Sequence, residues 1–173
     1  FVLLSVGELQ NRKNQRTVID ALGKLRNRKI YYLVVGRGEL YEEYDHLIRM
    51  YGLQDNIKLL GYRTDIDELC KITDCFVHPS VREGLGIAPL EAMASGLPLI
   101  SSYVNGIKDY TENEVSGCCL KNPTDVEEMV EAIEKVYKKS DFRIACGRNN
   151  KVTAKLFDIK NTNKIMEKLY KEI

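Results

Sequence analysis

The sequence lacks a large excess of charge, a paired cysteine motif and a long hydrophobic run. Its 173 residues contain 26 Lys and Arg against 25 Asp and Glu. This balance argues against a broad nucleic-acid-binding surface, although it allows a small basic pocket for a phosphorylated ligand. The five cysteines include no Cys-x-x-Cys pair, and the adjacent Cys118 and Cys119 cannot readily form an unstrained disulfide. We therefore expect reduced thiols and a cytosolic protein.

Further absences limit the organisation of the chain. No apolar run approaches the ~18 residues that span a bilayer, and no cationic, cleavable leader is visible. There is no internal repeat, low-complexity tract or Pro- or Ser-rich linker. We therefore predict a soluble, cytoplasmic protein with a single domain at 1–173. Because the first residues, FVLLSVG, have the pattern of a buried strand and no initiator Met, we expect further sequence upstream of Phe1 in the natural protein.

Apolar strand-like runs alternate with helical patterns along the chain. Near-continuous apolar strands with helices between them indicate a parallel sheet that is buried on both faces. We predict a Rossmann-like, doubly wound α/β fold of about six strands with a helical C-terminal end. The predicted strands are 1–7, 30–36, 56–61, 75–78, 97–101 and 117–120, and the predicted helices are 14–25, 40–51, 65–72, 87–95, 124–138, 141–156 and 159–173. The last helix has an apolar stripe that we expect to pack against another part of the protein, formed by Ile159, Asn163, Met166, Leu169 or Tyr170, and Ile173.

The most specific motif is REGLGIAPLEAMASGLP at 82–98, between a strand and a helix. In open α/β sheets, ligands bind at the carboxyl ends of the strands, where such turns lie. Gly84 and Gly86 have no Cβ to obstruct a ligand, and the free amides of 84–87 would form the N-terminus of a helix. A helix N-terminus carries about half a positive charge and binds phosphate readily.

Glu83 and Glu91 lie on either side of this turn. A carboxylate beside a phosphate is repulsive unless it accepts hydrogen bonds from neutral donors, and sugar hydroxyls are suitable donors. The arrangement points to a sugar on either side of a diphosphate. The alternative is that both are acids favoured at a helix start by the helix dipole.

Three other turns contain candidate residues. After the first strand, Arg12 and Lys13 could neutralise a diphosphate, although a solvated lysine is the simpler interpretation. Gly36 and Gly38 follow the second strand without the third glycine of a dinucleotide motif, so NAD binding is poorly supported. The segment 65–67, Asp-Ile-Asp, could bind a metal ion, but a capping box in which Thr64 caps the helix and Asp67 reaches back is simpler.

Taken in order, these turns resemble the C-terminal, donor-binding half of retaining GT-B glycosyltransferases of group 1 (family 4), the type that builds bacterial polysaccharides. The resemblance covers nearly the whole chain. Its segments are SVGEL, RKN, LVVGRGEL, LLGYR, DCFVHPS, REGLGIAPLEAMASGLP and SGCCLKNPTD. The E-x7-E motif from Glu83 to Glu91 is the most specific of them.

The resemblance implies a role for each matching residue. Glu91 would bind the ribose hydroxyls, and Glu83 would contact the transferred sugar as a catalytic residue together with Lys13. The amides of 85–87 would hold the diphosphate, and main-chain groups of Tyr62 and Arg63 would meet the base. Glu8 replaces a phosphate-binding Arg of many members, so Arg12 would have to compensate. The implied donor site comprises Gly7, Arg12, Lys13, Gly36, Tyr62, Arg63, Glu83, Gly84, Leu85, Gly86, Ile87, Glu91, Asn105 and Gly106.

The resemblance also implies a reaction and its partners. The enzyme would transfer a hexose with retention, from a nucleotide-diphosphate sugar, with UDP favoured, and with neither metal nor cofactor. The product would be a capsular polysaccharide, exopolysaccharide or lipopolysaccharide. A missing N-terminal domain of the same chain would bind a glycan or lipid-linked acceptor, at the inner face of the membrane in the full-length enzyme, and the fragment alone would be inactive.

Two other functions remain open on the sequence. A GT-B-like nucleotide-sugar epimerase or phosphorylase is one, and an epimerase would need a histidine in the cleft. Only His46 and His78 exist, and His78 ends a predicted strand. A non-catalytic nucleotide-binding module is the other, and it would not depend on Glu83.

Overall fold

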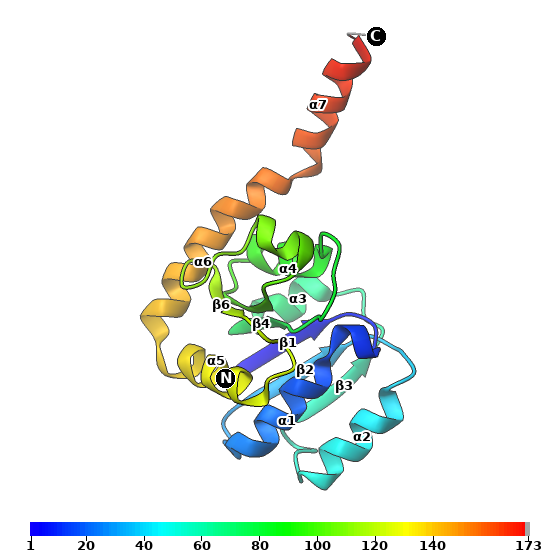
Figure 1. The fold of residues 1–173 in the computed structure, drawn as a ribbon, viewed down its shortest axis with the longest axis vertical. Coiled ribbons are helices and arrows are strands. Elements are labelled where there is room, and N and C mark those ends of the chain that lie inside the picture. The colour runs from blue at the N-terminus through cyan, green and yellow to red at the C-terminus, as the bar shows by residue number, and fades with distance from the viewer. Residues whose placement is uncertain (172–173) are drawn as a thin grey trace.

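The computed structural model describes residues 1–171 and leaves out the side chains at 162, 164 and 165. It contains a six-stranded parallel sheet in the order β3-β2-β1-β4-β5-β6 (Figure 1). The strands are β1 (Val2–Val6), β2 (Tyr31–Val35), β3 (Ile57–Gly61), β4 (Cys75–His78), β5 (Leu99–Ser102) and β6 (Gly117–Leu120). The predicted doubly wound fold is confirmed. Because the strand order reverses between β1 and β4, a crevice is expected at the carboxyl ends of these two strands.

Helices connect the strands and cover both faces of the sheet. They are α1 (Gln15–Leu25), α2 (Tyr41–Met50), α3 (Ile66–Lys71), α4 (Ile87–Ala94), α5 (Val126–Lys138), α6 (Ser140–Ala154) and α7 (Ile159–Lys171). Short 3-10 turns lie at η1 (Asn11–Lys13), η2 (Asn105–Asp109) and η3 (Lys155–Phe157). These bounds differ from the predicted helices by a few residues at most. Within residues 1–171, no helix is both long enough and apolar enough to cross a membrane.

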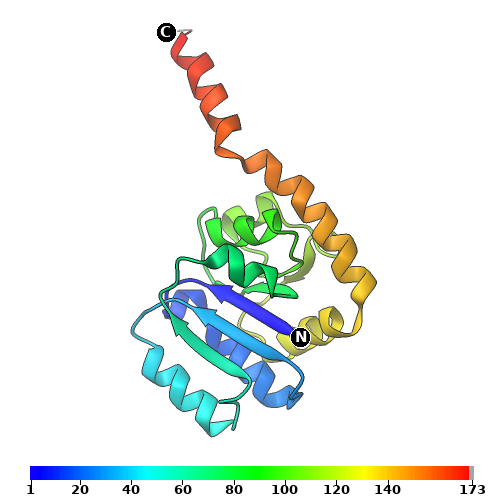
Figure 2. The ribbon, with the colours of Figure 1, turned by 180° about the vertical axis from the view of Figure 1, so that it is seen from behind.

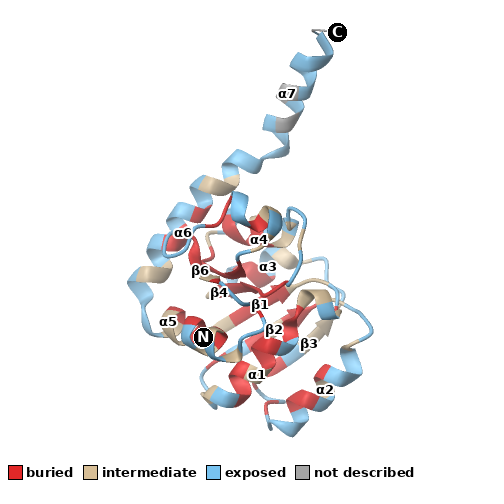
Figure 3. Cartoon of the chain, in the orientation of Figure 1, coloured by how far each residue is buried: buried red, intermediate tan, exposed pale blue. Residues whose placement is uncertain are grey.

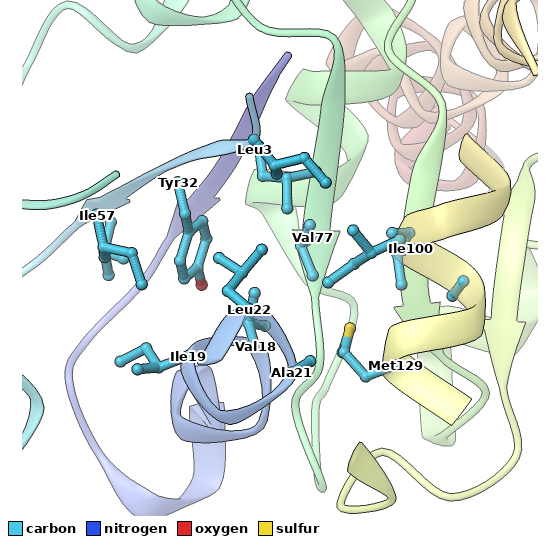
Figure 4. Close-up of a cluster of buried hydrophobic side chains, with 14 of the residues drawn as sticks. Leu3, Val18, Ile19, Ala21, Leu22, Tyr32, Ile57, Val77, Ile100 and Met129 are labelled. Carbon is cyan, nitrogen blue, oxygen red and sulfur yellow. The ribbon is translucent and has the colours of Figure 1, made fainter. Parts of the chain in front are cut away.

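Successive residues of each strand point to opposite faces of the sheet and build two apolar cores. On one face, Leu3, Val77 and Ile100 pack against α1 and α5, where Leu22 and Met129 are buried (Figure 4). On the other face, a second buried cluster forms against α3 and α4; its sheet members include Leu4, Phe76 and Leu99, and Met93 and Tyr110 also belong to it. Figure 2 shows the sheet from behind, and Figure 3 shows buried residues concentrated along the strands. This double coverage explains why the strand sequences are almost continuously apolar.

The C-terminal helices depart from this layered arrangement. Helix α6 packs against the rest of the domain. Its Asn150 Nδ2 donates to the carbonyls of Leu97 and Ser116 at 2.7 and 2.9 Å. Helix α7 then projects away from the domain (Figures 1 and 2). Its apolar side chains Ile159, Met166, Leu169 and Tyr170 are exposed. Ile173 of the predicted stripe lies outside the described residues, and the packing of this stripe on another part of the protein stays a prediction.

The predicted capping box at the start of α3 is wrong. The N-cap residue is Asp65 rather than Thr64, and no side chain caps this helix. The Asp65 carboxylate instead accepts two hydrogen bonds from the Arg63 guanidinium, at 2.8 and 2.5 Å. Because both side chains of this pair are exposed, the pair orients the Asp65 carboxylate toward Arg63 but contributes little to stability.

Asn14 ties the loop after β1 to two other loops. Its backbone has a left-handed φ of 55°, a conformation that asparagine tolerates better than most residues. The buried side chain donates to the carbonyls of Pro79 and Pro123 at 3.1 and 2.7 Å. Its Oδ1 accepts from Thr17 at 2.8 Å. The loop after β1 is therefore fixed against the carboxyl end of β4.

We predict that Asn14→Ala lowers the free energy of unfolding by about 2–4 kcal/mol, because two buried carbonyls lose their donor and alanine is strained at this φ. Denaturant unfolding measures the change. Asn149→Ala is the matched control, since Asn149 is exposed and donates only to the Val115 carbonyl at 3.4 Å. That control should cost roughly 0.5 kcal/mol or less. Equal losses in the two variants would contradict this role of Asn14.

Candidate functional site

A pocket of about 560 Å³ opens at the carboxyl ends of the central strands. Five of its six lining residues are predicted site residues, and Arg82 is the sixth. They come from the loops after β1, β4 and β5, and they are Arg12, Arg82, Glu83, Gly84, Asn105 and Gly106. A Cβ on Gly106 would lie 2.4 Å from the Gly84 carbonyl oxygen, so only glycine allows these two loops to approach so closely. The structure therefore brings five of the predicted site residues together at this crevice.

Glu83 lies at the centre of a cluster of donors in this crevice. Lys13 Nζ contacts Glu83 Oε2 at 2.5 Å, and Arg12 Nη1 lies 3.5 Å from Oε1. From the end of β4, His78 Nε2 and Ser80 Oγ lie 3.2 and 3.3 Å from the same Oε2. The Glu83 side chain is 11% exposed. Arg12 and Lys13, which we predict to neutralise the diphosphate, therefore contact the carboxylate that we predict to bind the sugar.

Burial and the neighbouring charges set the protonation of this cluster. The hydrogen bond with His78, supported by Lys13, holds the pKa of Glu83 well below its ordinary value, although burial acts in the opposite direction. Burial lowers the pKa of His78, opposed by its hydrogen bond to Glu83. At pH 7 the carboxylate is ionised and can only accept. The neutral imidazole must therefore carry its proton on Nε2 and donate it to Glu83.

His78 and Ser80 were not among the predicted site residues. The sequence offers His78 only as the histidine that an epimerase would need, and it gives no indication for Ser80. Ser80 is itself fixed, because Ser102 Oγ donates to its carbonyl at 2.5 Å. Their spacing of five and three residues before Glu83 is a possible sequence signal. It becomes a contact only because the loop folds back across the end of β4.

The loop at 84–87 presents amides at the start of α4. The N–H groups of Leu85, Gly86 and Ile87 donate to no acceptor within the described part of the chain. Gly86, the N-cap, has a left-handed φ of 72° and provides no side-chain cap. Uncompensated amides together with the helix dipole form an anion-binding site. The predicted role of this loop is therefore compatible with its geometry.

Glu91 lies beyond this loop and does not line the pocket of Glu83. Its exposed side chain on α4 borders a pocket of about 400 Å³ that also includes Thr64, Ile66 and Asp67. It also borders a pocket of about 760 Å³, whose apolar lining includes Leu85, Ile87, Leu90, Ala154 and Phe157. The two acids therefore face different spaces on either side of the amide loop.

Four further predicted residues lie outside the lining of the pocket of Glu83. Tyr62 and Arg63 directly follow β3, which is the edge strand of the sheet. The next residue, Thr64, lines the pocket of Glu91. Tyr62 is 67% exposed. Gly7 and Gly36 end β1 and β2, and their amides donate to Val35 and Gly61 carbonyls at 2.9 and 2.8 Å. None of these four residues lines the pocket of Glu83, so the structure does not bring all the predicted donor residues into one pocket.

The fold is that of one half of a GT-B glycosyltransferase. The family model "Glycosyl transferases group 1" matches residues 1–153. In Escherichia coli, UDP-Gal:alpha-D-GlcNAc-diphosphoundecaprenol alpha-1,3-galactosyltransferase is 33% identical over 142 residues, which cover 79% of this chain and 36% of that protein. The chain belongs to the group 1 glycosyltransferase family.

Two further similarities concern proteins of known structure. The lipopolysaccharide glucosyltransferase WaaG of Escherichia coli is 30% identical over 152 residues, covering 86% of this chain and 40% of that protein. A WaaG crystal structure has a TM-score of 0.81 at 28% identity, covering 91% of this chain and 43% of that chain. HepE of Anabaena in complex with UDP has a TM-score of 0.93 at 24% identity, covering 100% of this chain and 49% of that one. The chain spans less than half the length of the curated relatives named here.

We predict that His78 makes stability depend on pH below about pH 7, where an ordinary histidine begins to bind a proton. Because the folded-state pKa of His78 is lowered, the unfolded chain binds its proton first as the pH falls, and the free energy of unfolding decreases. A single proton gives a slope of at most about 1.4 kcal/mol per pH unit. Unfolding measured across this range should show a smaller slope in His78→Gln.

His46→Gln is the control for this measurement, because His46 is exposed on α2. It should keep the slope of the unsubstituted chain. Identical slopes for that chain and His78→Gln would show that burial of His78 does not contribute to the acid sensitivity.

Proposed function

We propose that this chain is the donor-binding domain of a glycosyltransferase that uses a nucleotide-diphosphate sugar. The observation that carries the proposal is the run of unpartnered amides at 85–87, with Glu83 in one pocket and Glu91 in the next. A diphosphate at the amides would extend a sugar toward Glu83 and a nucleoside toward Glu91. The pocket that Glu91 shares with Thr64 lies beside Tyr62 and Arg63, where we place the base.

The donor nucleotide is proposed to be UDP. The Escherichia coli relative at 33% identity has a UDP-sugar in its name, UDP-Gal. We further propose a role in synthesis of a cell-surface glycan, such as capsular or exopolysaccharide or lipopolysaccharide. The relative that supports this is WaaG, which is named a lipopolysaccharide glucosyltransferase. The matches named here are glycosyltransferases, which favours transfer over epimerisation.

The charges in the crevice suggest how the reaction is assisted. Arg12, Lys13 and Arg82 provide three positive charges, and Glu83 provides one negative charge. The site can therefore accept an anion. Together with the amides, these cations would stabilise the departing diphosphate, which is the role that a metal ion plays in other transferases. Each preorganised donor of this kind contributes about 3 kcal/mol to lowering a barrier. We therefore propose a metal-independent reaction without a cofactor. Retention at a hexose is proposed from the family resemblance.

Glu83 would exchange partners when the donor binds. In the structure it accepts from Lys13 and His78; with a donor present, Lys13 would turn toward phosphate and sugar hydroxyls would replace it at the carboxylate. Transfer itself requires an acceptor, a glycan or a lipid-linked sugar. We propose that a second GT-B domain binds this acceptor, and that the enzyme is cytoplasmic and peripheral at the inner face of the membrane.

We predict that UDP or a UDP-sugar raises the melting temperature of this chain. A ligand at about 100 times its dissociation constant adds roughly 2.7 kcal/mol to stability. A panel of UDP, GDP and ADP with their sugars, followed by calorimetric titration, identifies the base.

Glu91→Ala should weaken nucleotide binding by about 1–3 kcal/mol, because hydrogen bonds to a charged group are lost.

Glu131→Ala is the matched control for Glu91→Ala, since Glu131 is also an exposed helical glutamate, on α5. Its affinity for the nucleotide should equal that of the unsubstituted chain. If no ligand of the panel raises the melting temperature, donor binding by this chain is overturned. Full affinity in Glu91→Ala would place the ribose elsewhere.

Opposite effects are expected for the two members of the central ion pair. Glu83→Gln should keep or improve UDP affinity, because Lys13 and Arg12 lose their competing carboxylate. Lys13→Ala should weaken UDP binding by about 1–3 kcal/mol through loss of a charged hydrogen bond. Titration of UDP into both variants measures the difference, and a protein that also carries the acceptor domain should lose transfer in Glu83→Gln. If transfer survives in that variant, Glu83 has no catalytic role and the non-catalytic interpretation of this domain is favoured.

A further inference from the structure

Tyr110 lies behind the amide loop, on the side of the second apolar core. It follows η2 and is 6% exposed. Its Oη donates to the Leu85 carbonyl at 2.8 Å and lies 3.3 Å from the Gly86 carbonyl. The ring packs edge-on against Phe157 of η3, with centroids 5.5 Å apart. Since a hydroxyl has one proton, the Leu85 carbonyl is the main acceptor and the Gly86 carbonyl a weaker one.

Because the peptide bond is planar, the contacts of the Tyr110 hydroxyl also orient the N–H groups of Gly86 and Ile87. All described peptide bonds are trans, so the C=O and N–H of one peptide plane point in opposite directions. The plane that carries the Leu85 carbonyl also carries the Gly86 amide, and the next plane carries the Gly86 carbonyl and the Ile87 amide. A hydroxyl that draws both carbonyls toward the core turns both N–H groups away from it.

Gly86 makes this contact possible. A Cβ at this position would lie 3.1 Å from Tyr110 Oη and 2.8 Å from Ile107 Cδ1. Its φ of 72° also lies in the left-handed region. Because Gly86 has no Cβ, Tyr110 can approach the loop from the core side, and a ligand can approach it from the opposite side.

We propose that Tyr110 is a positioning residue that fixes the amides of Gly86 and Ile87 toward the diphosphate of the donor. This inference rests on the proposed function and deepens it, because it assigns the orientation of the anion-binding loop to a side chain outside the E-x7-E motif. Tyr110 does not touch the donor. It acts through the two carbonyls, and its effect is confined to the phosphate part of the ligand.

The test is Tyr110→Phe, which removes one oxygen and keeps the ring that packs on Phe157. Calorimetric titration of UDP, pyrophosphate and uridine separates the two parts of the ligand. Loss of one hydrogen bond should weaken UDP and pyrophosphate binding by about threefold to tenfold. Uridine, which has no phosphate, should bind within twofold of its affinity for the unsubstituted chain.

Tyr32→Phe is the matched control. It also removes a buried hydroxyl, which donates to Ser5 Oγ at 2.7 Å between β1 and β2. This variant should lose stability and keep the affinity for all three ligands. A purely structural effect of Tyr110 would weaken uridine and UDP equally, and that result would overturn the inference.

A second measurement does not depend on the variant. In the unsubstituted chain, the amide proton resonances of Gly86 and Ile87 should move downfield when pyrophosphate is added, and unchanged resonances would overturn the inference. If the unsubstituted chain binds UDP and Tyr110→Phe binds it equally well, the inference fails alone. If the unsubstituted chain binds neither UDP nor pyrophosphate, the proposed function fails and the inference with it.

Discussion

The carboxylate of Glu83 joins elements that are distant in the sequence. It binds Lys13 from the loop after β1 and His78 from the end of β4, and it also receives the amide of Gly84 at 3.3 Å. A largely buried carboxylate that loses its partners costs several kcal/mol, so these loops are stable only in an arrangement that satisfies it. The crevice between β1 and β4 is therefore held by electrostatic contacts, whereas the sheet beneath it is held by apolar packing.

The two sheet faces contribute to the site in different ways. The face covered by α1 and α5 is closed by aliphatic side chains and holds the start of α1, where Asn14 fixes the loop that carries Arg12 and Lys13. The face covered by α3 and α4 includes Tyr110 in its core, and the hydroxyl of this residue reaches the amide loop. The cations and the amides are thus fixed from opposite faces, and they meet only at the edge where the parallel strands end.

Much of this fold could be predicted from the sequence because its signals are local. Apolar runs of four to seven residues locate the strands, and helical periodicity locates the helices. Glu83, Gly84 and Gly86 could be found because their chemistry lies within one turn. Tyr110 could not be found in this way, since its partners Leu85 and Gly86 lie 25 and 24 residues away and the contact depends on how η2 packs. The capping box failed because α3 begins one residue later than the pattern predicts, with Asp65 rather than Thr64 at the N-cap position.

The two acids of the motif differ most in their surroundings, and this difference bears on their roles. Glu91 is exposed on the surface of α4, so its oxygens can accept hydroxyl donors without losing a buried partner. Glu83 has 11% of its side chain exposed and is already surrounded by donors. A ligand that enters the crevice competes with these donors for the carboxylate, and Lys13 is the donor that phosphate would attract most. In the proposed function, donor binding at the amide loop would therefore free one position at Glu83 and couple occupation of the proposed phosphate site to the availability of this carboxylate.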